Sequence, residues 1–118
     1  MIVRRESVVP FDFEGLRIRD YTAGAKSRSS LAVIQVPPGA RHPEAWSSRS
    51  EKYYYVVDGR VSFRVEGEER DLEAGDFCLV PQGHRFAYEN RTENVATLIL
   101  IHTPGYDGSA EHFTDAAL

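Results

Sequence analysis

Side chains able to do acid–base or nucleophilic chemistry gather in two short stretches of this chain. The first holds Lys52 and Tyr54 within an aromatic and β-branched run, and the second holds His84 and Tyr88. Because the side chains of a β-strand alternate between its two faces, Lys52 shares a face with Tyr54, and His84 shares one with Tyr88. The candidate reactive groups are therefore an ammonium, an imidazole and two phenols, and the fold must determine whether they share one site.

Lys52 has several possible roles. An ammonium buried beside aromatic rings has its pKa lowered by desolvation, which suits a general base, a Schiff-base nucleophile or a clamp for an anionic ligand. In the alternative, the Lys52 stem runs along apolar surface and its head reaches solvent or pairs with Glu44 or Glu51. The sequence leaves these roles open.

The histidines offer a second set of candidates. An imidazole side chain ordinarily titrates near neutrality, so His84 is a candidate general acid or base; in the alternative, it occupies a turn at the rim of a pocket. A metal site built from His42, Glu44, Glu51 and His84 is a further alternative. His102 and His112 are expected to be structural or solvated.

Composition narrows the class of protein. A chain of 118 residues with a formal net charge of −4 is expected to form a single domain, residues 1–118, with neither a nucleic-acid nor a membrane partner. The apolar run 95–101 is too short to span a bilayer, and the first residues lack the apolar segment of a secretory signal. One cysteine, Cys78, fits a small hydrophobe in a strand and a reducing cytoplasm.

Short alternating runs separated by Gly and Pro predict an all-β protein. The barrel core is expected over residues 16–104, after an extended arm at 1–14 that covers a sheet edge. Asp58-Gly59 between two apolar runs predicts a hairpin. The tail 105–118 breaks the pattern, and residues 109–118 are expected to form one or two helical turns or to fray.

Turn residues recur at fixed spacing in two stretches, and together they resemble the two sequence motifs of the cupin superfamily. The first motif is G, five residues, H-x-H, three or four residues, E, six residues, G; the second is G, five residues, P-x-G, two residues, H, three residues, N. The matching residues are Gly39, Gly59, Gly75, Pro81, Gly83 and Asn90. The resemblance covers roughly residues 31 to 104 and implies a single-domain cupin, a double-stranded β-helix or jelly-roll barrel.

The resemblance also implies where chemistry is expected. Cupin enzymes usually bind a divalent metal through the histidines and the glutamate of the motifs, and those positions hold Ala45, Ser47, Lys52 and Phe86 in this chain. All four ligands are replaced. We therefore expect a metal-independent cupin with no cofactor.

If the ligand positions face the barrel interior, so do their neighbours of the same parity. This predicts Lys52 and His84 as catalytic groups in a pocket with an aromatic wall. Trp46 is expected to cap the pocket mouth. The predicted substrate-binding residues are Ser47, Tyr54, Phe86, Tyr88 and Trp46.

Three functions compete. The first is a metal-independent enzyme of the isomerase, cyclase or lyase type acting on a small anionic or aromatic compound inside the barrel. The second is a ligand-binding or sensing module without catalysis, and the third is a metal-dependent dioxygenase or isomerase with displaced ligands. Small cupins are commonly dimers, so the resemblance also implies a homodimer.

Overall fold

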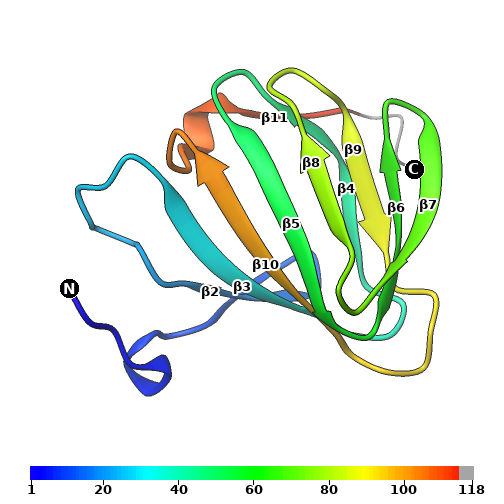
Figure 1. Ribbon diagram of the computed structural model, residues 1–118, viewed down its shortest axis with the longest axis horizontal. Helices are drawn as coiled ribbons and strands as arrows, with labels where there is room; N and C mark the ends of the chain where they lie inside the picture. The colour runs from blue at the N-terminus through cyan, green and yellow to red at the C-terminus, as the bar shows by residue number, and fades with distance from the viewer. Residues whose placement is uncertain (115–118) are drawn as a thin grey trace.

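Two antiparallel β-sheets face each other in the computed structural model, which describes residues 1–114 (Figure 1). The larger sheet has the order β1 (Phe11–Phe13), β2 (Leu16–Asp20), β3 (Ser30–Val36), β10 (Ala96–Thr103), β5 (Glu51–Asp58), β8 (Phe77–Val80). The smaller has the order β11 (Glu111–Phe113), β4 (Arg41–Ser47), β9 (Phe86–Glu89), β6 (Arg60–Val65), β7 (Glu68–Glu73). The predicted all-β jelly roll is confirmed.

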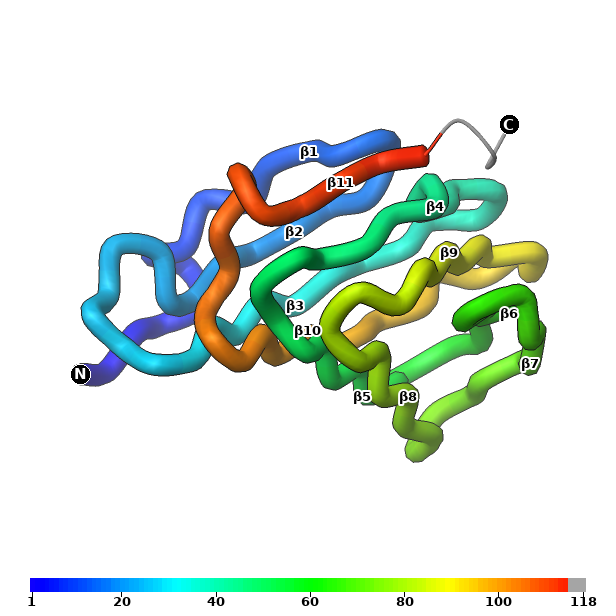
Figure 2. Tube along the Cα trace, turned by 90° about the horizontal axis from the view of Figure 1, so that it is seen from above, coloured from blue at the N-terminus to red at the C-terminus, as the bar shows by residue number. Residues whose placement is uncertain are grey.

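Seen from above, the two sheets extend side by side from one margin of the molecule to the opposite margin (Figure 2). β1 and β11 lie at one margin, and β8 and β7 lie at the opposite margin. The space between the sheets therefore has one end at β1 and β11 and the other end at β7 and β8.

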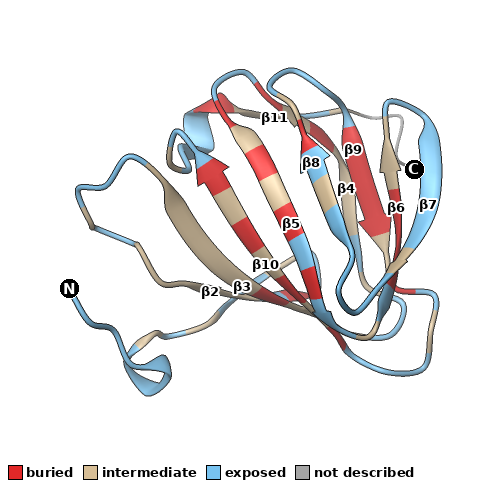
Figure 3. Ribbon diagram, in the orientation of Figure 1, coloured by how far each residue is buried: buried red, intermediate tan, exposed pale blue. Residues whose placement is uncertain are grey.

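Alternation in the sequence determines which side chains enter this interior. Along β5 and β10, buried residues alternate with more exposed ones (Figure 3). Tyr54 and Val56 from β5 and Leu98 and Leu100 from β10 point inward with almost no exposed surface. Burial of such apolar groups, at about 25 cal/mol per Å², is the main stabilising term of the fold.

Gly59 marks a passage between the sheets. The predicted hairpin at Asp58-Gly59 is wrong, because β5 belongs to the larger sheet and β6 to the smaller one. Gly59 has a φ of +82°, and a Cβ there would lie 2.7 Å from the Ala96 Cα. The position thus requires glycine both for its left-handed backbone and for the close approach of β10.

The two chain ends are more ordered than their composition predicts. Within the predicted arm, β1 pairs with β2 and adds an edge strand, after a short 3₁₀ turn, η1 (Arg5–Ser7). The prediction of helix or fraying after residue 109 is wrong for the described part of the tail. There, η2 (Gly108–Ala110) leads into β11, which pairs with β4; residues 115–118 lie outside the described residues. Within residues 1–114, none of the helices has the length and apolarity needed to cross a membrane.

Candidate functional site

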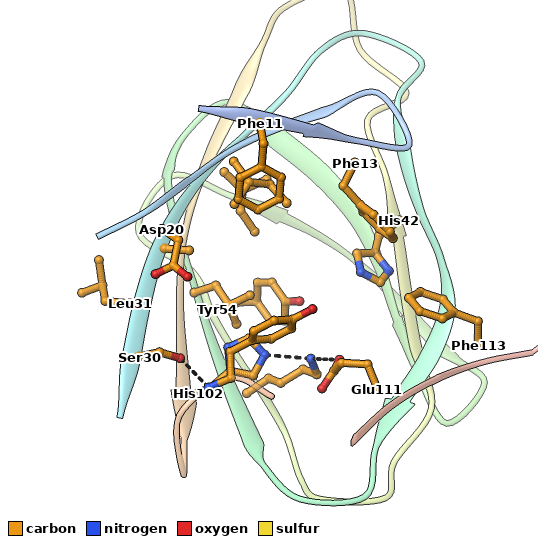
Figure 4. Close-up of a pocket in the computed structure, with 16 residues that line it drawn as sticks. Phe11, Phe13, Asp20, Ser30, Leu31, His42, Tyr54, His102, Glu111 and Phe113 are labelled. Carbon is orange, nitrogen blue, oxygen red and sulfur yellow. Dashed lines mark hydrogen bonds and ion pairs between the residues drawn. The ribbon is translucent and has the colours of Figure 1, made fainter. Parts of the chain in front are cut away.

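A cavity of about 130 Å³ lies between the sheets at the margin of β1 and β11 (Figure 4). Phe11 and Phe13 of β1 and Phe113 of β11 line it, so both ends of the chain contribute to its wall. The polar side chains of the lining are those of Asp20, Ser30, His42, Lys52, Tyr54, His102, Tyr106 and Glu111. An engineered apolar cavity of about 150 Å³ holds benzene, so the space suits a compact ring rather than an extended ligand.

Lys52 lies on the inner face of β5 and is 3% exposed. Its Nζ donates to Glu111 Oε1 at 2.5 Å and to His102 Nε2 at 2.9 Å, which are the two dashed contacts around the ammonium in Figure 4. It also lies 5.2 Å from the centroid of the Phe86 ring. Desolvation lowers the Lys52 pKa, and the Glu111 charge opposes that shift.

This arrangement corrects the expected partners of Lys52. Glu44 bonds Arg64 and Thr114 instead, and Glu51 accepts a hydrogen bond from the Tyr53 hydroxyl. Strand parity separates Glu51 from its neighbour Lys52, because adjacent residues of β5 face opposite sides of the sheet.

Glu111 leaves one oxygen free for a ligand. Its Oε1 binds Lys52, while its Oε2 is buried and has no hydrogen-bond partner among the described residues. A buried acceptor without a donor costs about 1–3 kcal/mol, which a hydroxyl or N–H group of a bound molecule would offset.

His102 is a neutral partner of the ion pair. An ammonium only donates hydrogen bonds, so His102 Nε2 accepts from Lys52 and carries no proton. Desolvation, reinforced by the Lys52 and His42 charges, lowers the His102 pKa to about 3.

His42 faces the cavity from β4 with a defined tautomer. Its Nδ1 lies 2.7 Å from the Pro43 carbonyl oxygen, which can only accept, so Nδ1 carries the proton and Nε2 keeps its lone pair. Its ring packs against Phe86 at 4.9 Å and Tyr88 at 5.3 Å between centroids. Desolvation lowers its pKa to about 4, so at neutral pH it is an uncharged acceptor.

The structure brings Lys52 and Tyr54 together in the cavity lining. Phe86 lies under the ammonium, and Tyr88 packs against Tyr54 with ring centroids 5.6 Å apart. Both are buried behind the lining, and the Tyr88 hydroxyl has no hydrogen-bond partner among the described residues. Tyr54, Phe86 and Tyr88 pack into one aromatic cluster that faces inward, as their parity predicts, but only Tyr54 lines the cavity.

Two predicted substrate-binding residues lie elsewhere. Ser47 is buried, but its hydroxyl accepts from the backbone N–H groups of Arg49 and Ser50 and so stabilises a turn. Trp46 does not cap the mouth; it stacks on His112 of β11 at 4.2 Å. Ser47 and Trp46 are both absent from the cavity lining.

The inward orientation expected of His84 is wrong. His84 is exposed, because β9 begins only at Phe86 and the His84 backbone N–H closes a turn onto the Pro81 carbonyl. It borders a groove at the opposite margin of the sheets, beside β7 and β8. The acid–base candidates that the sequence missed are His42, His102 and Glu111.

The displaced metal site is not assembled either. His42 faces the interior, whereas Glu44 bonds Arg64 and His84 lies at the far margin. Among residues 1–114, no three His, Cys, Asp or Glu side chains are placed to hold one metal ion.

Comparison with protein families matches the cupin domain model over residues 32–102, more than half of the chain. The chain belongs to the cupin family. The predicted resemblance is therefore confirmed, and the fold together with the family indicates a small-molecule-binding barrel.

Among curated relatives of this cupin, the tetracenomycin polyketide synthase protein TcmJ of Streptomyces glaucescens is 34% identical over 63% of this chain and 50% of its own. The polyketide synthase CurC of Streptomyces cyaneus is 31% identical over 70% of this chain and 53% of its own. The chain thus spans about half the length of these two relatives.

Solved cupin structures share the fold. Pac13, described as a nucleoside dehydratase, is 23% identical, with a TM-score of 0.84 over 97% of this chain and 90% of its own. A Streptomyces Pac13 variant determined with uridine is 24% identical, with a TM-score of 0.80 over 92% of this chain and 86% of its own.

Proposed function

We propose that this cupin is a metal-independent enzyme that performs proton-transfer chemistry, an elimination or isomerisation, on a small uncharged ring compound bearing hydroxyl groups. The observation that carries the proposal is the unpartnered Glu111 Oε2 beside the Lys52 ammonium, in a cavity that a neutral His42 also lines. A base, an acid and a ligand anchor thus lie around one space.

The charges of the lining favour an uncharged ligand over the anionic one expected from Lys52 alone. Lys52 is the single ammonium of the lining, and Glu111 already neutralises it. Asp20 adds a second carboxylate, and the two histidines are neutral. An added phosphate or carboxylate would meet this carboxylate without a free cation, so anions are disfavoured.

The replaced motif positions support a mechanism without metal. Ala45 and Phe86 offer no donor atom, the Ser47 hydroxyl serves a turn, and Lys52 presents a cation where a metal carboxylate would stand. These four side chains do not form a donor set for a divalent ion.

The proposed elimination divides its steps between two residues. His42 Nε2 accepts a proton from a ligand carbon, the freed electron pair forms a C=C bond, and the C–O bond to the neighbouring hydroxyl breaks. The Lys52 ammonium gives that oxygen a proton, so that water leaves, and the two residues later exchange a proton with solvent. General acid–base catalysis of this kind contributes about 10²- to 10⁴-fold to a rate.

The relatives suggest which ligand chemistries to test. Pac13 is described as a nucleoside dehydratase and one of its variants was determined with uridine, while TcmJ and CurC are polyketide synthase proteins. Nucleosides and small polyketide rings are uncharged and hydroxylated, which makes them the first compounds to test.

Uridine and uridine 5′-monophosphate form a matched pair for the binding test. The proposal predicts that uridine shifts backbone amide resonances of cavity residues in NMR spectra, and that the phosphorylated compound binds more weakly. Tighter binding of the phosphate would overturn the uncharged-ligand assignment.

Each nucleoside or small polyketide that binds is then tested as a substrate. Mass spectrometry detects the loss of water from the compound, and NMR detects the uptake of deuterium from D₂O. We expect His42→Gln to keep binding but to lose turnover, whereas His84→Gln at an exposed site keeps both. Binding by the wild-type chain with neither water loss nor deuterium uptake would favour the non-catalytic binding module instead.

A further inference from the structure

Three aromatic side chains at one end of the cavity are exposed although they line the space between the sheets. Phe11 of β1 is 52% exposed, Phe113 of β11 is 53% exposed and Tyr106 is 56% exposed, and all three line the cavity. The inward-facing residues Val56 and Leu98 of the central strands are almost fully buried. We call Phe11, Tyr106 and Phe113 the mouth aromatics.

Strand parity shows where the exposed surface of two of these rings lies. Phe113 shares a face of β11 with Glu111, whose side chain lines the cavity. Phe11 likewise shares a face of β1 with Phe13, which packs against His42. Because β1 and β11 are the last strands of their sheets at this margin, no further strand within residues 1–114 covers the two rings. Their exposed surface is therefore at the opening of the cavity.

We propose that the mouth aromatics bind a flat ring carried by the substrate, so that the substrate is a compound of two parts. This inference rests on the proposed function and specifies its substrate class. The hydroxylated ring that reacts lies inside the cavity, and an aromatic or heteroaromatic ring attached to it lies at the opening. Exposed apolar surface beside a cavity is a mark of ligand binding.

The size of the cavity separates the two parts of such a compound. The space of about 130 Å³ is close to that of a cavity that holds benzene, so it has room for one ring. Within this space, the unpartnered Glu111 Oε2 offers an acceptor to a hydroxyl group of that ring. A second ring attached to the first must therefore extend to the opening, where the mouth aromatics lie.

The ring of Phe113 continues into the reacting part of the site. It lies 6.2 Å from the His42 ring between centroids, with only 20° between the two planes, and 5.8 Å from the Phe13 ring. Figure 4 shows Phe113 beside His42, and Phe11 on a different side of the same space. A flat ring stacked on Phe113 gains an aromatic contact in addition to the apolar area that it buries. This contact would hold the rest of the compound next to the proposed base.

Tyr106 is held at the opening before any ligand arrives. Its ring meets the His102 ring edge-on, with 5.3 Å between centroids, and its backbone N–H donates a hydrogen bond to Ser30 Oγ. Phe11 and Phe113 are fixed by the pairing of their strands. A ligand ring therefore meets aromatic faces that are already in position, which reduces the entropic cost of binding.

Two matched pairs of compounds test this inference by isothermal titration calorimetry. The first pair is uridine and methyl β-D-riboside, and the second is phenyl β-D-glucoside and methyl β-D-glucoside. The members of a pair share a hydroxylated ring and differ in the flat ring. We expect the flat-ring member of at least one pair to bind roughly tenfold more tightly than its methyl partner. The proposal is overturned when neither flat ring improves binding.

Three variants locate the contribution of the flat ring. Phe11→Leu and Phe113→Leu keep an apolar side chain but remove its flat face, so each should weaken binding of the flat-ring compound by roughly threefold or more. Binding of the methyl glycoside should stay unchanged. Phe77→Leu is the matched control, because Phe77 is 55% exposed but lies on β8 at the opposite margin. Circular dichroism first confirms that all three variants are folded. An equal effect of all three variants, or no effect of Phe11→Leu and Phe113→Leu, overturns the proposal.

The binding test is independent of turnover, so its failure is distinct from a failure of the proposed function. A compound that binds through the mouth aromatics and is not converted would retain the two-part ligand and remove the catalytic role. Conversion of a hydroxylated ring whose binding gains nothing from a flat ring would retain the catalytic role and overturn the two-part substrate.

Discussion

Lys52 and Glu111 form an ion pair inside the cavity, with 2.5 Å between Nζ and Oε1, although 59 residues separate them in the chain. The pair joins β5 of the larger sheet to β11 of the smaller one. The C-terminal strand therefore has two roles, because it closes the cavity and supplies the countercharge that holds Lys52 in a buried position.

Removing one partner of this ion pair should lower the free energy of unfolding more than removing both partners. We expect Lys52→Met to lower the free energy of unfolding by about 3–5 kcal/mol, since it leaves a buried carboxylate without a cation. The double variant Lys52→Met with Glu111→Leu should recover most of that loss. Urea denaturation measures both; a double variant as unstable as the single one would contradict the ion-pair account.

Acid should destabilise the fold through its buried histidines. The His42 pKa is lowered from 6.5 to about 4, so below pH 6.5 the unfolded chain binds a proton that the folded chain does not. The stability is complete above about pH 6.5 and falls until pH reaches about 4, a loss of roughly 3 kcal/mol from this group alone.

The variant His42→Phe isolates this effect. Removal of the titrating ring should reduce the dependence of the unfolding free energy on pH between 6.5 and 4, and buried His102, whose pKa is lowered to about 3, should supply the dependence that remains. His84→Gln at an exposed site is the control variant. Identical slopes for the wild type and His42→Phe would show that His42 is not held neutral by the fold.

Two glycines with nearly the same φ angle should lose different amounts of stability when each is replaced by alanine. Gly59 has a φ of +82° and Gly67 one of +81°, but a Cβ at Gly59 would meet the Ala96 backbone whereas one at Gly67 would meet open space. We expect about 1 kcal/mol of destabilisation for Gly67→Ala and about 3 kcal/mol or more for Gly59→Ala. Equal thermal shifts would contradict the close packing of β10 on this turn.

Asp20 offers a direct test of the cavity charge. Its Oδ1 accepts from Thr22, a role that an asparagine oxygen can also fill, so Asp20→Asn removes the charge with little change in shape. Loss of a nearby like charge should improve binding of uridine 5′-monophosphate by roughly fivefold, about 1 kcal/mol. Asp12→Asn at an exposed site is the control, and an equal response of both variants would contradict the charge argument.

The fold could be predicted from the sequence because the spacing of turn glycines and the alternation of strand residues are both visible within short stretches of the chain. The same alternation correctly placed Lys52 and Tyr54 in one cavity and turned Phe86 and Tyr88 inward, although these two rings lie behind the cavity lining. It failed for His84, because the strand that parity requires begins two residues later, at Phe86.

The missed residues depend on contacts between distant segments. Glu111 lies in a tail whose sequence resembles a loop, and only the pairing of β11 with β4 carries it to Lys52. His102 did leave a signal, since it continues the alternate buried positions Leu98 and Leu100 of β10. The protonation state of His42 depends on its burial among aromatic rings from several strands. The spacing of residues in the sequence does not show that these rings meet.

The proposed mechanism depends on His42 facing the cavity as an uncharged base. The most direct measurement is ¹⁵N NMR of histidine side chains across a pH series, with His42→Gln used to assign the resonance. We expect a proton on Nδ1, none on Nε2, and a pKa of about 4 for the His42 ring. A pKa near the ordinary value of 6.5, or a proton on Nε2 at neutral pH, would contradict the claim and remove the proposed base from the site.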